Sequence, residues 1–130
     1  IGDKRGRPWT IGVRDPRRAD GLFFFNDTAT TEIYTSGDYE RFFEKNGVRH
    51  HHIVDPATGA SPSAVRSVTV LAPDGLTCEA LSKTVFVLGV QRGMELIESL
   101  DGVDAIVVDA AGHLHFSSGM SAGRTPARHQ

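Results

Sequence analysis

The residues best suited to chemistry form one short stretch, HHHIVDPATG at positions 50–59. It places imidazole nitrogens, a carboxylate and a hydroxyl close together in the chain. Asp55 precedes a proline, which disfavours the α-helical region and predicts an extended or turn conformation. Thr58 and Gly59 then offer a hydroxyl and a flexible backbone where the chain can reverse. Such a stretch is typical of a site that lies where a strand ends.

The three consecutive histidines do not form one cluster if they lie on a strand. Side chains alternate along a strand, so His50, His52 and Val54 would share one face, and His51 and Ile53 the other. The plain alternative is a strand-end histidine followed by an Asx-type turn, and from these residues alone that interpretation is the stronger one. No serine has a nucleophile-elbow context, which excludes serine-hydrolase chemistry.

A second candidate group lies in CEALSK, residues 78–83. Glu79 precedes Lys83 by four residues, the favourable order for an exposed helical ion pair worth about 0.2–0.5 kcal/mol. Glu79 in a first helical turn would also complement the helix dipole. Alternatively, a carboxylate and neighbouring oxygens at a helix start hold a hard metal ion. The residues alone do not decide between the two.

The composition excludes several classes of function. A chain of 130 residues forms one domain with one core. Its 14 Lys and Arg residues nearly balance its 16 Asp and Glu residues, so nothing suggests nucleic acid as a partner. The single cysteine, Cys78, excludes an internal disulfide framework and a zinc ribbon. No apolar run approaches membrane-spanning length, and no signal peptide is recognised.

The chain opens at Ile1 rather than at a methionine. We therefore expect residues 1–130 to be a single partial domain, the C-terminal part of a longer protein. Its Gly-, Ser- and Arg-rich end, about 119–130, is expected to be frayed.

Periodicity and turn residues predict an α+β fold with a mainly antiparallel sheet and two helices packed on it. Asn46-Gly47 is the strongest hairpin signal. Thr77 is the expected N-cap of the first helix, with Leu81, Val85 and Leu88 as its core stripe and Glu79, Ser82, Lys83 and Phe86 on a second face. The expected strands are 8–14, 22–35, 39–43, 48–54, 66–72, 103–108 and 113–117, and the expected helices are 78–88 and 91–100. Ser36, Gly37 and Asp38 are expected to form a turn, or a backbone stretch open to close approach by a ligand.

Four blocks, taken together, resemble the FAD:protein FMN transferases, the ApbE family. They are TSGDYER (35–41), HHIVDPATG (51–59), SVTVLAPDGLTCEALSKTVFVLG (67–89) and the strand pair near 104–118. Their order and spacing fit the C-terminal half of that family, and PWTIGVRDP (8–16) resembles the strand that precedes them. The resemblance covers nearly the whole chain except 22–34. It implies that the chain is the C-terminal part of a larger ApbE-like fold.

The resemblance also implies an activity. Family members bind FAD as a substrate, use Mg²⁺, and transfer the FMN moiety onto a threonine of an acceptor protein as a phosphoester, releasing AMP. His52 matches the active-site histidine, which would take the threonine proton or stabilise charge as the phosphoester forms. Ile53 would lie against the flavin nucleotide with its backbone available for hydrogen bonding. Asp55 and Thr58 would hold the turn that aims His52. The residues that would line the same pocket are Ser36, Gly37 and Asp38.

The metal positions of the family fall on Glu79, Ser82 and Lys83, and two of them depart from its pattern. The family usually has an Asp where this chain has Glu79, and a Thr where it has Lys83. A charged lysine does not bind a metal, but it neutralises phosphate as a point charge. We hypothesise that Lys83 replaces part of the metal's charge at the pyrophosphate, so that the metal dependence is looser than usual.

Two other functions stay open beside the transferase. One is a flavin-binding or structural relative that has lost transfer, which the changes at Glu79 and Lys83 allow. The other is an α+β interaction module, which would require the agreement of the four blocks to be chance.

The resemblance implies a location and a partner as well. The expected acceptor is a subunit of a membrane redox complex, and the expected location is the bacterial cell envelope, tethered on the outer side of the inner membrane. Because much of the flavin site in this family comes from the N-terminal half, the chain alone is expected to be inactive.

Residues 23–35, FFFNDTATTEIYT, resemble something else, the translated read-through of a sequencing adapter that contaminates assembled genes. The phenylalanines that open it fall on both faces of a strand, and Asn26-Asp27 are poor strand residues. The hypothesis is that these residues are not native, and the glycosylation pattern at Asn26 accordingly carries no weight.

Overall fold

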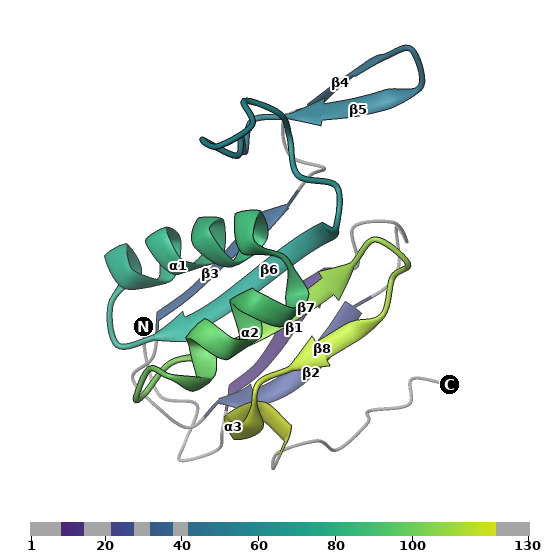
Figure 1. The fold of residues 1–130 in the computed structure, drawn as a ribbon. Helices are drawn as coiled ribbons and strands as arrows, with labels where there is room; N and C mark the ends of the chain where they lie inside the picture. The colour runs from purple at the N-terminus through teal and green to yellow at the C-terminus, as the bar shows by residue number, and fades with distance from the viewer. Residues whose placement is uncertain (1–8, 15–21, 28–31, 38–41, 122–130) are drawn as a thin grey trace.

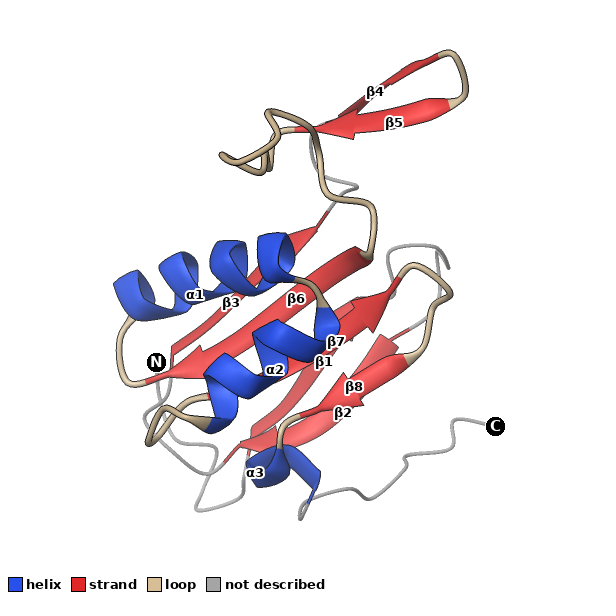
Figure 2. Cartoon of the chain, in the orientation of Figure 1, coloured by secondary structure: helices blue, strands red, loops and turns tan. Residues whose placement is uncertain are grey.

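The computed structural model describes residues 9–14, 22–27, 32–37 and 42–121. They form the expected α+β fold with an antiparallel sheet (Figures 1 and 2). In chain order the elements are β1 (Trp9–Arg14), β2 (Leu22–Asp27), β3 (Glu32–Gly37), β4 (Phe42–Lys45), β5 (Val48–His51), β6 (Val65–Ala72), α1 (Gly75–Leu88), α2 (Val90–Glu98), β7 (Asp104–Asp109), β8 (Leu114–Phe116) and α3 (Ser118–Ser121).

The main sheet has four strands in the order β3-β6-β7-β8, and each neighbouring pair is antiparallel. The hairpins β1–β2 and β4–β5 each form a separate two-stranded sheet. Figure 1 shows the β4–β5 hairpin projecting from one end of the main sheet. The candidate chemistry at 50–59 therefore lies at the base of a projecting hairpin, not on the main sheet.

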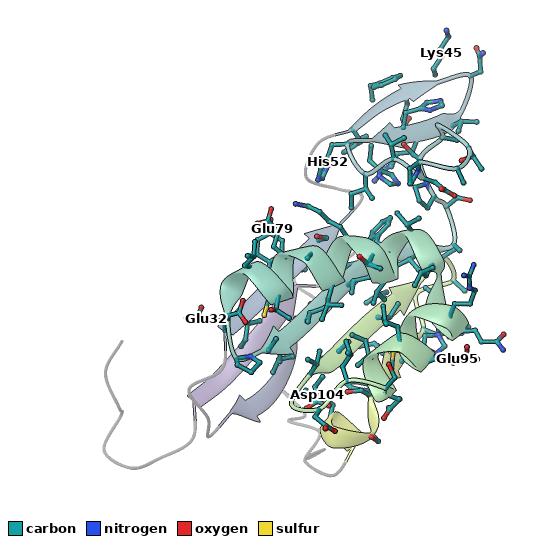
Figure 3. All side chains as sticks on the ribbon, turned by 60° about the vertical axis from the view of Figure 1, so that its left-hand side comes forward. Glu32, Lys45, His52, Glu79, Glu95 and Asp104 are labelled. Atoms are coloured by element: carbon teal, nitrogen blue, oxygen red, sulfur yellow. The ribbon has the colours of Figure 1, made fainter. Side chains whose placement is uncertain are left out.

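The core lies between the main sheet and the two longer helices. α1 contacts β3 and β6, and α2 contacts α1 and β7. Val68, Val70 and Ala72 of β6 are buried as predicted, and they belong to one apolar cluster with the buried residues of the helices. The other face of β6 is buried too, and Figures 1 and 3 place the β1–β2 hairpin on the side of the sheet away from the helices.

Helix α1 begins at Gly75 rather than at Cys78, and its N-cap is Asp74 rather than Thr77. Asp74 accepts hydrogen bonds from the Thr77 backbone N–H and the Thr77 hydroxyl, both at 2.8 Å. These bonds lower the pKa of the Asp74 carboxyl. The prediction was wrong because Asp and Thr are both good N-caps, and in this chain the Asp74 carboxylate binds the free N–H of Thr77.

The buried face of α1 also differs from the predicted stripe. Leu81 and Leu88 are only partly buried, and of the predicted stripe only Val85 lies fully in the core. Ser82 and Phe86, which the periodicity placed on a second face, are fully buried. The core face of α1 is made by Cys78, Ser82, Val85 and Phe86. Apolar residues lie all round this helix, so the period alone did not fix which side meets the sheet.

Two glycines control the step from α1 to α2. Gly89 has φ 85°, a left-handed conformation that suits glycine, and it ends α1 immediately before α2 begins at Val90. A Cβ built on Gly93 would lie 2.6 Å from Val85 Cγ1. The glycine therefore allows the two helices to approach closely. α2 was predicted at 91–100 and ends at Glu98, with Ile97 buried.

Several predicted strands need correction. Residues 22–35 do not form one strand, because β2 pairs with β1 whereas β3 pairs with β6 in a different sheet. Ser36 and Gly37 are not in a turn, since they are the last residues of β3. The strand predicted at 48–54 ends at His51. Residues 39–41 of the strand predicted at 39–43, together with Asp38, lie outside the described residues.

The other predicted elements are confirmed within one or two residues. β1, β6, β7 and β8 match the strands predicted at 8–14, 66–72, 103–108 and 113–117. Asn46 and Gly47 both have positive φ, 53° and 74°, as a type I′ hairpin turn requires. Of the tail predicted to fray, residues 119–121 lie in α3 and the rest is outside the described residues.

Candidate active site

The three histidines differ sharply in environment. His51, the last residue of β5, is 7% exposed, and Ile53 is 5% exposed and belongs to the core cluster. His52, between them, is exposed. His50 is partly buried, with its ring stacked on Phe43 at 5.1 Å between centroids. The alternation of side chains predicted for a strand thus continues past His51, where β5 ends. It turns the imidazole of His52 to solvent.

A network of hydrogen bonds braces the turn that follows His52. The Asp55 carboxylate accepts from the Ala57 N–H at 2.8 Å, and the Thr58 hydroxyl accepts from the Ala60 N–H at 3.3 Å. The Asp55 backbone closes the turn by donating to the Ala60 carbonyl at 2.9 Å and accepting from the Gly59 N–H at 2.8 Å. Asp55 and Thr58 are therefore turn residues, as the sequence indicated, and the bonds of both side chains stay within the turn.

The Ile53 side chain is buried and does not face solvent. That side chain is packed in the core cluster, so only the backbone of Ile53 is left for a nucleotide. The alternation that exposes His52 is the reason, because it turns the next side chain inward.

Ser36 and Gly37 lie at the end of β3, opposite Val68 and Ser67 of β6. The Ser36 side chain is buried, and its hydroxyl forms a hydrogen bond of 2.8 Å with the hydroxyl of Ser82 on α1. Ser82 in turn donates to the Glu79 carbonyl at 2.9 Å. The Ser36 side chain thus faces α1 and the core. Of Ser36, only backbone atoms are left to line the predicted pocket.

Of the three predicted metal positions, the structure brings Glu79 and Lys83 together and turns the Ser82 side chain away from them. Glu79 and Lys83 form an i, i+4 ion pair on the surface of α1, each side chain a little under half exposed. The hydrogen bond that the Lys83 ammonium donates to the Glu79 carboxylate raises the pKa of Lys83, which keeps the ammonium charged. Ser82 points into the core instead. Among the described residues, no group of three His, Cys, Asp or Glu side chains has a metal-binding arrangement.

Figure 3 relates the two candidate regions. His52 at the base of the hairpin and Glu79 on α1 project to the same side of the molecule, away from Glu95 and Asp104. The hairpin base therefore presents an imidazole on the side where α1 presents the Glu79 carboxylate and its partner, the Lys83 ammonium. Imidazole and ammonium are groups that suit a phosphate ester, the first as a proton acceptor and the second as a point charge.

Sequence reasoning missed two residues of this region, His51 and Ser61. The Ser61 hydroxyl accepts from the His51 N–H at 3.0 Å and donates to the His51 carbonyl at 2.9 Å. Strand alternation placed His51 on the same face as Ile53 and opposite His52, without indicating which face is buried. Nothing in the sequence marked Ser61, because its partner is a backbone that lies beside it only once the turn has formed.

Comparison with known protein families identifies the fold. The model of the ApbE family matches residues 1–107. The chain belongs to the ApbE family. This ApbE chain is 37% identical over 114 residues to the FAD:protein FMN transferase of Treponema pallidum, covering 86% of this chain and 32% of the relative. It is 37% identical over 102 residues to the FAD:protein FMN transferase of Klebsiella pneumoniae, covering 77% and 32%.

Solved ApbE structures have the same fold. The ApbE protein of Thermotoga maritima superposes with a TM-score of 0.80 at 36% identity, covering 92% of this chain and 39% of that one. The flavin transferase ApbE of Vibrio cholerae superposes with a TM-score of 0.75 at 28% identity, covering 94% and 40%. The chain thus spans about a third of the length of the curated relatives and two fifths of the solved structures.

No helix among the described residues is long and apolar enough to cross a membrane.

Proposed function

We propose that this chain is the C-terminal part of an FAD:protein FMN transferase. Membership of the ApbE family and the names of the relatives that it matches support the proposal. The observation that carries it for this chain is the environment of His52. Its imidazole is exposed at the first residue of a braced turn, and it makes no hydrogen bond or ion pair with any other described residue. It is therefore open to a substrate.

The proposed reaction moves the FMN moiety of FAD to a threonine of an acceptor protein. The threonine oxygen attacks the FMN phosphorus, a new P–O bond forms, and the bond from that phosphorus to the bridging oxygen breaks. AMP leaves with the bridging oxygen, and the proton of the threonine hydroxyl passes to His52. General-base help of this kind contributes about 10²–10⁴-fold in rate.

The side chains proposed at the metal positions, Glu79, Ser82 and Lys83, have other partners in the described structure. Glu79 is already paired with Lys83, and the Ser82 hydroxyl is buried and bonded to Ser36. Mg²⁺ needs several oxygens in near-octahedral geometry, and these three side chains do not form such a set. We keep Lys83 as the group that neutralises the pyrophosphate, because its ammonium is charged and is paired with Glu79, which projects to the same side of the molecule as His52.

The partners and the location follow from the family resemblance. We propose FAD and an acceptor protein as the substrates, with a subunit of a membrane redox complex as the acceptor and the bacterial cell envelope as the site of action. Labelling in isolated inner-membrane and soluble fractions, with the modified protein identified by mass spectrometry, tests both statements. Label only on soluble cytosolic proteins contradicts them.

The experiment that tests the transfer uses the complete protein that contains this chain, with FAD, Mg²⁺ and an acceptor carrying a threonine target. Covalent flavin fluorescence should appear on the acceptor, and His52→Ala should lower its rate at least a hundredfold. His113→Ala is the matched control, since His113 is an exposed histidine in the turn between β7 and β8. It should label normally.

A second function competes with transfer because of the ion pair between Glu79 and Lys83. If the family's metal position has been lost, the protein binds flavin without transferring it. Tight FAD binding by the wild type with no labelled acceptor supports that alternative and contradicts the transferase.

A further inference from the structure

We propose that His51 is a positioning residue for His52. This inference rests on the proposed function, and it gives the two neighbouring histidines opposite roles. His52 meets the substrate, whereas His51 is buried and closes the turn from which His52 projects. The support comes from the contacts of His51 with Ser61, Pro62 and Phe86.

The first support is the set of hydrogen bonds that join the two ends of the turn. The backbone of His51 exchanges two hydrogen bonds with the Ser61 hydroxyl, at 3.0 and 2.9 Å. The ring Nε2 of His51 lies 2.9 Å from the Pro62 carbonyl oxygen. Three bonds from one residue therefore hold residues 61 and 62 beside the end of β5. The segment between, 52–60, becomes a closed loop with His52 as its first residue.

The bond to Pro62 also determines which ring nitrogen of His51 carries a hydrogen. A carbonyl oxygen only accepts, so Nε2 must carry the hydrogen. In the neutral ring the acceptor is then Nδ1, which is buried and has no hydrogen-bond partner among the described residues. With Nε2 bonded and Nδ1 enclosed, His51 has no nitrogen open to a substrate. A direct catalytic role is left to His52.

The second support is the packing of His51. Its ring meets the ring of Phe86 edge to face, with 5.2 Å between centroids, and Phe86 is fully buried on α1. Ile53, on the other side of His52, is buried in the same core. His52 therefore stands between two side chains that are anchored to the body of the protein. A histidine in a loop without such anchors would sample many directions, and a shift of about 1 Å in a reacting group costs up to about 10²-fold in rate.

The test uses three substitutions in the complete protein. His51→Leu removes the bond to Pro62, and His51→Gln offers an amide N–H in its place. Ser61→Ala removes the hydroxyl that clamps the backbone of His51. Ser63→Ala is the matched control, because Ser63 is an exposed serine of the same segment whose hydroxyl bonds to no other described residue.

The expected kinetic result is a fall in kcat with little change in KM for FAD. We expect kcat to drop 10- to 100-fold in His51→Leu and Ser61→Ala, to recover in part in His51→Gln, and to stay unchanged in Ser63→Ala. Added imidazole should rescue His52→Gly and not His51→Gly, because only the former lacks the reacting group. An unchanged kcat in both His51→Leu and Ser61→Ala overturns the proposal, and so does rescue of His51→Gly by imidazole.

A second readout does not depend on activity. Amide hydrogen exchange in residues 53–60 should be at least tenfold faster in Ser61→Ala than in the wild type, and unchanged in Ser63→Ala. If the wild type transfers no FMN, the proposed function fails, and the exchange rates still test the clamp. If the wild type transfers FMN and Ser61→Ala exchanges as slowly as the wild type, the positioning role fails alone.

Discussion

The hydroxyl groups of Ser36 and Ser82 lie 2.8 Å apart and join the end of β3 to the middle of α1. Ser82 donates its one hydrogen to the Glu79 carbonyl, so Ser36 is the donor between the two hydroxyls. Both side chains are buried. The family resemblance placed Ser36 in the flavin pocket and Ser82 at the metal site. The hydrogen bond between them is buried, so it links these two segments within the core.

Ser82→Ala should therefore destabilise the protein without changing its affinity for Mg²⁺. The substitution leaves the Ser36 hydroxyl buried without an acceptor, which costs about 1–3 kcal/mol. Ser36→Ala should cost less, because Ser82 keeps its bond to the Glu79 carbonyl. Urea unfolding measures the two free energies, and calorimetric titration measures Mg²⁺ binding. A weaker Mg²⁺ affinity in Ser82→Ala at unchanged stability would show that the hydroxyl is a ligand instead.

Lys83→Ala should lower transfer activity much more than it lowers stability. The Glu79–Lys83 pair is exposed, so its loss should change the free energy of unfolding by less than about 0.5 kcal/mol. If Lys83 neutralises the pyrophosphate, the wild type keeps part of its activity in excess chelator and Lys83→Ala does not. Activity that a chelator abolishes and that Lys83→Ala leaves unchanged contradicts this role.

Asp109 should make the protein sensitive to acid. The hydrogen bond from His115 Nε2, at 2.9 Å, and those from the backbone of His113 and Ala111 hold the pKa of Asp109 well below its usual value. A carboxyl whose pKa is lower in the folded state stabilises the fold above the unfolded-state pKa of about 3.9. That contribution is lost as the pH falls below this value.

Asp109→Asn tests this dependence, since the amide oxygen still accepts from the two backbone N–H groups. The urea midpoint of the wild type should fall between pH 5 and pH 2.5, and the midpoint of Asp109→Asn should fall less steeply. Asp101→Asn, at an exposed carboxyl in the turn before β7, is the control and should follow the wild type. Equal slopes for Asp109→Asn and the wild type would rule out Asp109 as the source.

Gly93→Ala should destabilise the packing of α2 on α1. The new Cβ would lie 2.6 Å from Val85 Cγ1 and 3.2 Å from the Val85 carbonyl oxygen, so side chain and backbone must both shift. Overpacking of this kind costs about 1–3 kcal/mol, which outweighs the gain of up to about 1 kcal/mol in helix propensity. Thermal unfolding measures the net effect.

The double substitution Val85→Ala/Gly93→Ala should cost less than the sum of the two single ones, because Val85→Ala removes the nearest clashing atom. Gly75→Ala is the matched control, since Gly75 opens α1 and a Cβ added there would meet no described atom within 4 Å. It should be neutral or slightly stabilising. If the losses of stability in Val85→Ala and Gly93→Ala add strictly, the clash with Val85 is not the cause of the destabilisation by Gly93→Ala.

Residues 23–35 give a prediction about the gene rather than the protein. Resequencing an independent clone should recover different codons there, if adapter read-through is the source. Replacement is compatible with the structure at Glu32 and Tyr34, which are exposed, and the bond from Cys78 Sγ goes to the backbone carbonyl of Glu32. Thr35 differs, because its hydroxyl lies 2.9 Å from the hydroxyl of the buried Thr69 on β6. Recovery of the same codons contradicts the hypothesis.

Local sequence signals predicted most helices and strands. The directions of several side chains depend on packing between distant segments, which those signals do not contain. Asn46-Gly47 gave the hairpin because its backbone requirement is local. The direction of Ser82 was not predictable, since it depends on Ser36, which lies far away in the sequence. The clamp between His51 and Ser61 forms only when the intervening turn has closed. For the site, strand alternation separated the three histidines and the family resemblance singled out His52, but neither revealed what holds that histidine.

The turn at Asn46 and Gly47 has a consequence at the opposite end of its hairpin. It sets the register in which Phe42 faces His51 and Phe43 faces His50. A slip of one residue turns every side chain of β5 to the other face. His51 would then point to solvent and His52 into the core against α1. The Asn46-Gly47 turn at the far tip of the hairpin thus acts together with the contacts of His51 in setting which imidazole faces solvent, and a one-residue slip of the pairing would oppose those contacts.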